Sequence, residues 1–322
     1  MKANSIGKSA LKVITKQKAV VAIIFMMIVM IFPKTKFYTA YSMLEMLRSA
    51  AILEIVAFGV TCAVLAGGCD LSVGGTLCMG GILSIMCMNA GMPIWLSFVV
   101  ALAVGAVIGF INGFLVVHQK CEPFIITLGM GMLLKGICQQ ITTAKPLGCK
   151  NMEFMKISNT KFFGSVPSLV VYMIILLAVF YCILRYTSYG RNLYAIGGNY
   201  EVAKYSGIKV VPTKWSTFVI SGITATLAGV LLSSRMNTGN SVYGDTTGMM
   251  VNCGCVIGGT SFAGGEGGVI QSFIGLMVVQ MLSTCMSALS VDGFWQKLIE
   301  GLLIVAIIAA DCYSRKLKRE RV

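Results

Sequence analysis

The chain has 322 residues, of which 57% are hydrophobic and only 12% are charged, and its formal net charge is +14. A soluble domain has about 25% charged residues, so this composition excludes an ordinary water-soluble fold and indicates a membrane protein. The positive charge does not indicate nucleic-acid binding, because Lys and Arg gather before the first apolar run and after the last, as membrane-surface anchors do.

Runs of apolar residues predict an all-α polytopic membrane fold with about ten transmembrane helices, since a helix needs about 20 residues to cross the hydrocarbon. The predicted spans are 19–32, 50–67, 73–90, 94–117, 123–142, 168–185, 214–233, 247–260, 268–289 and 295–311. The first and eighth are short, and the third and eighth are rich in Gly, so some helices are expected to be broken or re-entrant. No small-residue cleavage site follows the first run, which we therefore expect to stay as a helix.

The basic residues also predict the orientation. With the N-terminus inside, residues 1–18, 186–213 and 312–322 are cytoplasmic and residues 143–167 are outside, and Lys and Arg are about twice as frequent inside as outside. The predicted organisation is a basic N-terminus, a single transmembrane domain at 19–311, and a basic tail.

Asp70 opens the phrase DLSVGG directly after Gly67-Gly68-Cys69, in a break between two predicted spans. Asp and Ser are favoured at the N-terminus of a helix, so Asp70 and Ser72 are expected to cap N–H groups where a helix starts within the membrane. Direct contact with a substrate is the alternative.

Other charges also fall inside predicted spans, among them Glu54, Lys135 and Glu300, and the single histidine lies at the end of a span. Glu54 and Glu300 are interpreted as buried or protonated packing residues, with a proton site as the alternative. Lys135 needs a partner or water, but the sequence names no partner for it. His118, beside Gln119 and Lys120, is interpreted as an interfacial surface residue.

The stretch YGRNLYAIGGNYEVAKYSGIKVVPTK, residues 189–214, separates two apolar blocks and is unusually polar for this chain. Asn199 as N-cap, Glu201 in the first turn and Gly207 as C-cap predict a helix at 200–206. A helix of two turns is unstable alone, but between two spans it is suited to receive force from a docked partner. An ordinary solvated connector is the alternative.

A short phrase occurs twice. Gly-Gly-Thr followed by Gly-Gly is found at 74–81 and again at 258–265. Duplicated halves are common in transporters, so the phrase suggests an internal repeat. Chance recurrence in a Gly-rich sequence is the alternative.

Catalytic and metal-binding patterns are missing from the sequence. It has no Ser/His/Asp set and no paired carboxylates at helical spacing. Its twelve cysteines are scattered, mostly inside apolar runs, and we interpret them as small core residues. The Gly-rich stretch 258–268 lacks the G-x-x-x-x-G-K-[ST] phosphate-binding pattern. If ATP drives this protein, we expect another chain to bind it.

Five phrases occur in a recognisable order and spacing: 67–74 (GGCDLSVG), 124–129 (FIITLG), 190–199 (GRNLYAIGGN), 206–208 (SGI) and 258–261 (GGTS). Together they closely resemble the permease subunits of bacterial ABC importers for ribose, xylose, galactose and related small sugars. The resemblance covers about residues 50–311.

The resemblance implies a type II-like permease of the plasma membrane, forming a homodimer and binding no cofactor of its own. It also implies a cytoplasmic subunit that binds ATP, and an extracytoplasmic solute-binding protein that delivers a sugar-like substrate. The stretch 186–213 would be the coupling segment, with docking residues Asn199, Tyr200, Glu201, Val202, Ala203, Lys204, Tyr205, Ser206 and Gly207. We expect most of that contact from Val202, Ala203 and Tyr205. The residues expected at the translocation path or in its structural support are Asp70, Ser72, Gly74, Gly75, Lys135, Gly258, Gly259 and Thr260.

The sequence departs from its relatives at two places. They usually carry Arg where Lys135 stands, and Tyr-Glu-Leu-Asp-Ala-Ile where this chain has TGMMVN at 247–252. Both acids are lost there, and the sequence does not identify the sugar. The alternative function is an ion-coupled secondary transporter, which would use an intramembrane carboxylate. A membrane enzyme would need titratable pairs that the sequence lacks.

Overall fold

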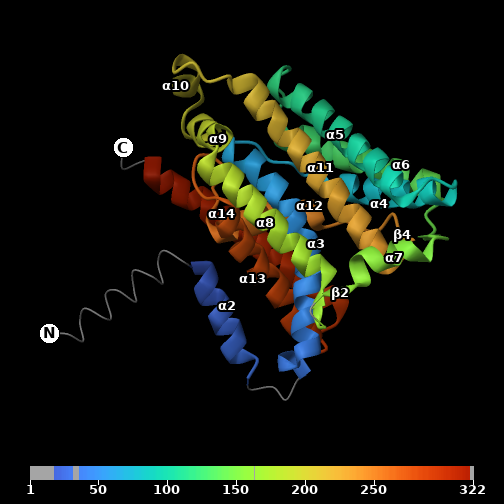
Figure 1. Cartoon of the computed structure of the whole chain (residues 1–322). Coiled ribbons are helices and arrows are strands. Elements are labelled where there is room, and N and C mark those ends of the chain that lie inside the picture. The colour runs from blue at the N-terminus through green and yellow to red at the C-terminus, as the bar shows by residue number, and fades with distance from the viewer. Residues whose placement is uncertain (1–17, 32–35, 163, 320–322) are drawn as a thin grey trace.

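A computed structural model describes residues 18–31, 36–162 and 164–319, and its elements form a helical bundle (Figure 1). The predicted basic N-terminus lies outside the described residues except for Lys18, and so do residues 320–322 of the predicted tail. The helices are α2 (Lys18–Val29), α3 (Ala40–Leu65), α4 (Val73–Asn89), α5 (Ile94–Val117), α6 (Pro123–Thr142), α7 (Met152–Asn159), α8 (Ser168–Tyr186), α9 (Ser188–Gly198), α10 (Tyr200–Tyr205), α11 (Val210–Met236), α12 (Thr247–Gly258), α13 (Val269–Ala288) and α14 (Gly293–Arg319), with a 3-10 turn η1 (Lys36–Tyr38).

Each predicted span falls on one of these helices, and the bounds of α5 and α6 match the prediction residue for residue. Within the described ranges, six helices are long and apolar enough to cross a membrane: α3, α5, α6, α8, α11 and α13. The apolar helices α2 and α12 are shorter, as expected for the first and eighth spans, and the Gly-rich α4 is shorter as well. Helix α14 continues beyond residue 311 to Arg319, so the predicted tail begins as part of this helix.

Two short antiparallel strand pairs lie at the end of the bundle opposite α9 and α10 (Figure 1). Strand β1 (Leu147–Gly148) pairs with β4 (Thr238–Gly239), with Leu147 opposite Gly239. Strand β2 (Lys161–Phe162) pairs with β3 (Val166–Pro167), with Lys161 opposite Pro167. The pairing of β1 with β4 joins two connections that are predicted to lie outside the membrane, residues 143–167 and residues 234–246, and α7 lies within the first of them.

Helix α11 packs closely against α3, α4 and α5. Small residues make this contact: Gly222 lies against the Gly105 backbone of α5, and Gly229 lies against the Leu77 backbone of α4. Lipid tails are as apolar as Leu, so membrane helices associate through such close backbone packing rather than through the hydrophobic effect. Glycines of α11 therefore allow this helix to approach α4 and α5 closely.

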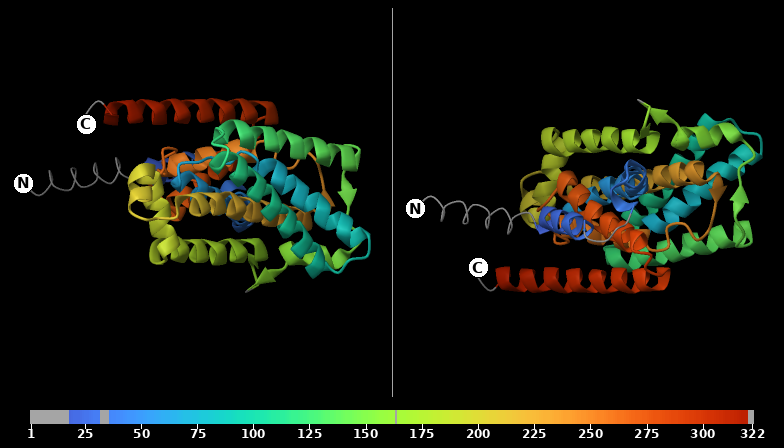
Figure 2. Two further views of the ribbon diagram at one scale, coloured as in Figure 1. Left: turned by 90° about the horizontal axis from the view of Figure 1, so that it is seen from above. Right: turned by 90° about the horizontal axis from the view of Figure 1, so that it is seen from below.

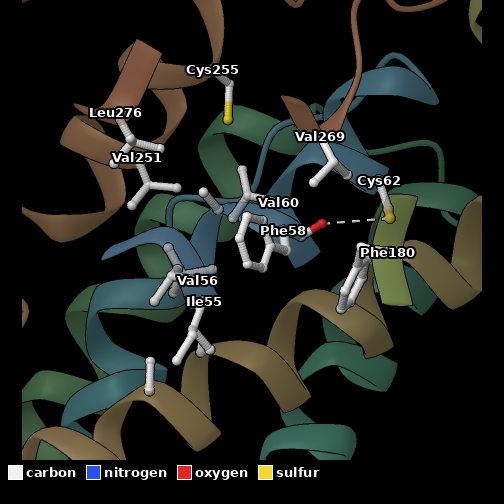
Figure 3. Close-up of a cluster of buried hydrophobic side chains, with 14 of the residues drawn as sticks. Ile55, Val56, Phe58, Val60, Cys62, Phe180, Val251, Cys255, Val269 and Leu276 are labelled. Carbon is white, nitrogen blue, oxygen red and sulfur yellow. Dashed lines mark hydrogen bonds between the residues drawn. The ribbon is translucent and has the colours of Figure 1, made fainter. Parts of the chain in front are cut away.

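A hydrophobic cluster lies between α3, α8, α12 and α13 (Figure 3). The rings of Phe58 on α3 and Phe180 on α8 are 6.0 Å apart, and Val251, Cys255 and Leu276 complete the contact from α12 and α13. Most of the described cysteines are buried, as the sequence predicted.

Helix α14 lies along the outside of the bundle, on the side opposite α8 (Figure 2). Its apolar side chains Phe294, Trp295, Leu298 and Leu302 are exposed, and α6 also presents a broad apolar face. These two helices therefore offer an extended apolar surface to lipid or to another protein.

Candidate translocation site and coupling segment

Asp70 lies in the break between α3 and α4 and is fully buried. Its Oδ1 accepts hydrogen bonds from the backbone N–H of Ser72 (3.0 Å) and from Ser72 Oγ (2.6 Å), and its Oδ2 accepts one from Ser221 Oγ (2.7 Å) on α11. A carboxylate out of reach of water needs such donors, because an unsatisfied buried polar group is costly. These bonds tie the break to α11.

This geometry corrects the predicted cap. The N-cap residue of α4 is Ser72, but its side chain makes no capping hydrogen bond. Asp70 bonds instead to the backbone N–H of Ser72 itself, ahead of the helix, in the manner of an Asx turn. Ser72 is thus the N-cap residue, as expected, and Asp70 satisfies one N–H group at this end of the helix, that of Ser72. The expectation that the Ser72 side chain also caps α4 is wrong, because its Oγ donates to Asp70 and accepts from Asn112.

Two asparagines that the sequence analysis missed extend this network. Asn112 on α5 donates to Ser72 Oγ (2.8 Å), and Asn252 on α12 donates to the Asp70 carbonyl (2.9 Å) and the Gly248 carbonyl (2.7 Å). The break before α4 is thus joined to α5, α11 and α12. The sequence did contain a signal for both residues, because an amide side chain inside an apolar span must find hydrogen-bond partners in the membrane. Asn252 also stands where the related permeases usually read Ile.

A cavity of about 360 Å³ lies beside this network, a size within the range of small-molecule sites. Its walls come from the break before α4, the start of α6, α12, the loop after α12, and α14. The lining residues include Gly68, Leu71, Phe124, Asn252, Phe262 and Ile304. The described residues thus place a small cavity against the buried polar network.

The predicted motif glycines lie in two different settings. Gly74 and Gly75 lie in the first turn of α4, where a Cβ would meet the Gly244 carbonyl and, at 2.6 Å, the Gly131 carbonyl. Gly258 ends α12, and Gly259 follows it as the C-cap in the left-handed region. Thr260 is buried, and its Oγ1 lies 3.1 Å from Ser272 Oγ.

These settings also correct the predicted repeat. Residues 74–81 are helical within α4, whereas residues 258–265 run from the last residue of α12 into a loop. The two Gly-Gly-Thr phrases therefore do not occupy equivalent positions, and the interpretation of them as corresponding parts of duplicated halves is wrong.

Lys135 has the partner that the sequence could not name. Its ammonium group forms an ion pair with Asp245, in the connection before α12, and both side chains are partly exposed. Asp245 was missed because it lies far along the chain and is brought to α6 only by the fold. Gly75 lies beside the same stretch of α6, so this helix is held to α4 and to the Asp245 connection.

Two other titratable residues have contrasting surroundings. Glu54 on α3 is fully buried, and neither of its carboxylate oxygens has a hydrogen-bond partner among the described residues. His118 packs against Phe114 and Trp215, at ring-centroid distances of 5.3 and 4.8 Å.

The polar segment after α8 folds into α9 and α10. Asn199 Oδ1 accepts the N–H groups of Glu201 and Val202, both at 3.1 Å, which confirms the predicted N-cap. The helix is one residue shorter than predicted, with Ser206 as C-cap. Gly207 follows at φ +81°, and the N–H groups of Gly207 and Ile208 bond back to the Lys204 and Ala203 carbonyls, which is a Schellman ending.

One residue of the predicted docking face is misplaced. Ala203 is only 3% exposed, because it packs against Ile196 of α9, Ile208 and Val210 of the same chain. Its side chain therefore holds α10 in place and does not face outward. The residues that do face outward are Tyr200, Glu201, Val202, Lys204, Tyr205 and Ser206.

The backbone of α9 contacts two Gly-rich breaks, which are the break between α3 and α4 and the loop between α12 and α13. Gly197 lies so close to the Leu65 carbonyl and to Gly265 that a Cβ would overlap both. Gly265 N–H also donates to the Leu65 carbonyl (3.0 Å), and the Tyr194 hydroxyl donates to the Gly267 carbonyl (2.9 Å). Burial raises the pKa of the Tyr194 phenol above its ordinary value, so the hydroxyl keeps its proton as a donor. The segment is thus in direct contact with the end of α3 and with the loop after α12.

Comparison with known proteins gives consistent results. The profile of a family described as branched-chain amino acid transport system / permease component matches residues 42–308. The chain is 30% identical over 301 residues to the ribose import permease protein RbsC of Haemophilus influenzae, covering 92% of this chain and 93% of that protein. It is 31% identical over 276 residues to the D-allose transport system permease protein AlsC of Escherichia coli, covering 85% and 84%. It is also 29% identical over 265 residues to the L-arabinose transport system permease protein AraH of the same organism, covering 82% and 80%.

Proposed function

The chain belongs to the family of branched-chain amino acid transport system permease components, and from this premise we propose that it is the permease subunit of an ATP-driven importer of a small sugar. The observation that carries this proposal is the similarity, over most of the chain, to permeases named for ribose, allose and arabinose. It is a transport subunit and not an enzyme, and ATP is hydrolysed on a separate cytoplasmic subunit.

The cavity beside Asp70 forms part of the translocation path. Its volume of about 360 Å³ suits a small solute, and it borders a break in the helices where polar groups come together from α5, α11 and α12. A sugar crossing the membrane must exchange its hydrogen bonds to water for others, so a path next to a polar break lowers the cost of desolvation. A solute-binding protein outside the membrane delivers the substrate.

Helix α10 is the docking element for the ATP-binding subunit. Support comes from its exposed Val202 and Tyr205 and from the caps at both of its ends, which hold a helix too short to persist alone. Aromatic side chains are frequent energetic centres of protein interfaces. Glu201 and Lys204 lie at the rim of this contact.

The assembly is a homodimer in a bacterial plasma membrane, with both termini and residues 186–213 in the cytoplasm. The apolar faces of α6 and α14 are suited to pack against a second copy. The shorter helices α2, α4 and α12, together with α14, add to the six long apolar helices and bring the total to ten crossings or broken spans. The excess of Lys and Arg on the proposed cytoplasmic side supports this orientation.

Co-purification and uptake test this proposal. The tagged full chain should retain an ATP-binding subunit, and vesicles containing the complex should take up a radiolabelled pentose or hexose only when ATP is inside and a solute-binding protein is outside. An ion-coupled secondary transporter is the second candidate, favoured by the buried carboxyl group of Glu54, which has no hydrogen-bond partner in the part of the chain that the structure describes. Uptake that survives ATP depletion but stops when the proton and sodium gradients are dissipated would favour that candidate and contradict ours.

A further inference from the structure

A second cavity, of about 380 Å³, lies away from the candidate path, between the end of α8, the middle of α9 and the start of α13. Arg185, Arg191, Tyr181 and Tyr194 line it, together with Gln271, and its lining includes no Asp or Glu.

The two arginines retain most of their hydrogen-bonding capacity. Neither forms an ion pair with a described residue, and the one side-chain bond found for Arg191 is to Ser188 Oγ at 2.8 Å. A guanidinium group has five donors in a planar fork that matches the oxygens of a phosphate. The cavity is therefore suited to an anion with several acceptor oxygens, a description that fits a phosphate group.

The surroundings distinguish a lipid phosphate from a free one. Helix α8 is on the outside of the bundle, opposite α14, and carries the exposed apolar side chains Ile174, Ile175 and Val179 on the turns that lead to Arg185 (Figure 2). Ile270 is exposed beside the cavity. A lipid would use this surface for its acyl chains, whereas a free phosphate would use none of it.

The position along α8 matches the level of lipid headgroups. Tyr181 lines the cavity, and its ring meets that of Tyr186 edge to face, with the centroids 6.2 Å apart. Tyr is enriched where membrane helices meet water, because its ring is apolar and its hydroxyl is polar. Arg185 precedes Tyr186 in the last turn of α8, so we expect the two guanidinium groups at the level of the phosphates of a bilayer leaflet.

We propose that this cavity binds the headgroup of an anionic phospholipid, with Arg185 and Arg191 holding its phosphate. The leaflet is the cytoplasmic one, which rests on the orientation proposed above. The binding itself does not depend on sugar transport. Basic cavities between transmembrane helices are known to hold such headgroups, and each basic residue contributes about 1 kcal/mol at a membrane surface.

Native mass spectrometry of the purified full chain tests the proposal. The detergent-solubilised protein is titrated with phosphatidylglycerol, and separately with phosphatidylcholine of the same acyl chains. We expect phosphatidylglycerol to bind the unmodified chain more tightly, and the double variant Arg185→Gln/Arg191→Gln to lose about 30-fold in apparent affinity for it. Phosphatidylcholine has the same phosphodiester but also a choline cation, which the two guanidinium groups repel, so its binding should be weaker from the start and should change less in the variant. Equal binding of the two lipids, or an unaltered affinity in the variant, would overturn the proposal.

Two controls separate the other sources of anion. The variant Lys145→Gln/Lys161→Gln removes two exposed basic residues toward the opposite end of the bundle and should leave lipid binding within about twofold. An equal loss in this control would mean diffuse attraction and no site. Displacement of phosphatidylglycerol by millimolar inorganic phosphate would mean a free-anion site and would also overturn the proposal.

Two further measurements keep the test decisive. If the Gln double variant is not recovered as a monodisperse protein, Arg185→Lys/Arg191→Lys replaces it, and we expect an intermediate affinity because the charge stays while the fork is lost. If the Gln variant binds phosphatidylglycerol normally but loses the ATP-binding subunit, the arginines serve an acidic surface of that subunit, and the lipid proposal is wrong.

Discussion

The crossing of α4 with α11 and the contact of α9 with the Gly-rich breaks both depend on glycine, yet they differ in what surrounds them. Gly229 of α11 faces the backbone of Leu77 in the middle of the bundle. Gly197 of α9 faces the end of α3 and a loop, and the outward face of α10 begins directly after it. Close backbone contact therefore joins two membrane helices in the first region, and in the second it joins the membrane breaks to an exposed element. We expect the crossing of α4 with α11 to determine whether the chain folds. We expect the contact of α9 with the breaks to determine how transport is coupled to ATP hydrolysis.

The largest effect is expected at the helix crossing. In Gly229→Ala the new Cβ would overlap the Leu77 carbonyl oxygen, so α4 and α11 must move apart, at a cost of about 3 kcal/mol. The thermal midpoint and the monodisperse yield of the purified chain should both fall. Gly136→Ala on α6 is the matched control, because no atom lies within 4 Å of its added Cβ, and its stability should change by about 1 kcal/mol at most. Equal thermal midpoints and yields for the two variants would contradict the claim that Gly229 is needed for the close packing of α4 and α11.

The buried carboxylate between the two regions should come next. Asp70→Leu removes the acceptor of three hydrogen bonds, and each stranded donor costs about 1–3 kcal/mol, so little folded protein should reach the membrane. Asp70→Asn keeps a carbonyl acceptor and should lose only about 1 kcal/mol, with most transport retained. Membrane abundance and sugar uptake measure the two effects. An Asn variant that folds normally but transports nothing would show that the charge itself acts in transport.

The contact of α9 should affect coupling more than folding. Gly197→Ala pushes α9 away from Leu65 and Gly265, whereas the adjacent Gly198→Ala adds a Cβ with no atom within 4 Å. For Gly197→Ala we expect normal capture of the ATP-binding subunit but a loss of about tenfold or more in the stimulation of ATP hydrolysis by loaded binding protein. Gly198→Ala should match the unmodified protein. If Gly197→Ala retains full stimulation, the contact carries no coupling.

The smallest effect is expected at the ion pair of Lys135 with Asp245. Both side chains are more than a third exposed, so the pair is worth about 0–1 kcal/mol. Lys135→Gln and Asp245→Asn should each change the thermal midpoint slightly, and the double variant should differ little from either. A much larger coupling energy between the two positions would indicate that the pair acts as a structural clamp of α6.

Helix positions could be predicted because each depends on a contiguous run of apolar residues, as the exact bounds of α5 and α6 illustrate. The N-cap at Asn199 was also predictable, since an N-cap bonds to N–H groups two and three residues away. The Schellman ending at Gly207 is local in the same sense.

The polar network was not predictable, because Ser221 and Asn252 reach Asp70 only when α11 and α12 pack beside the break. The same reason explains the error at Ala203. A helix of two turns has no strong apolar pattern, and which face is buried depends on Ile196 and Val210 from neighbouring helices. Local pattern therefore predicted where helices lie, and tertiary contact decided which of their residues form the site.

The docking face of α10 gives the most direct test of the central claim, which is that this chain is a permease driven by ATP hydrolysis on another subunit. The variant Val202→Asp/Tyr205→Asp places two charges on the most exposed apolar positions of α10 without touching buried Ala203. Tyr41→Asp, which charges an equally exposed tyrosine near the start of α3, is the matched control. The measurement is co-purification of the ATP-binding subunit together with ATP-dependent uptake, at equal membrane abundance. We predict that the double variant loses both and the control keeps both. A double variant that still captures the subunit and transports sugar at the normal rate would contradict the account.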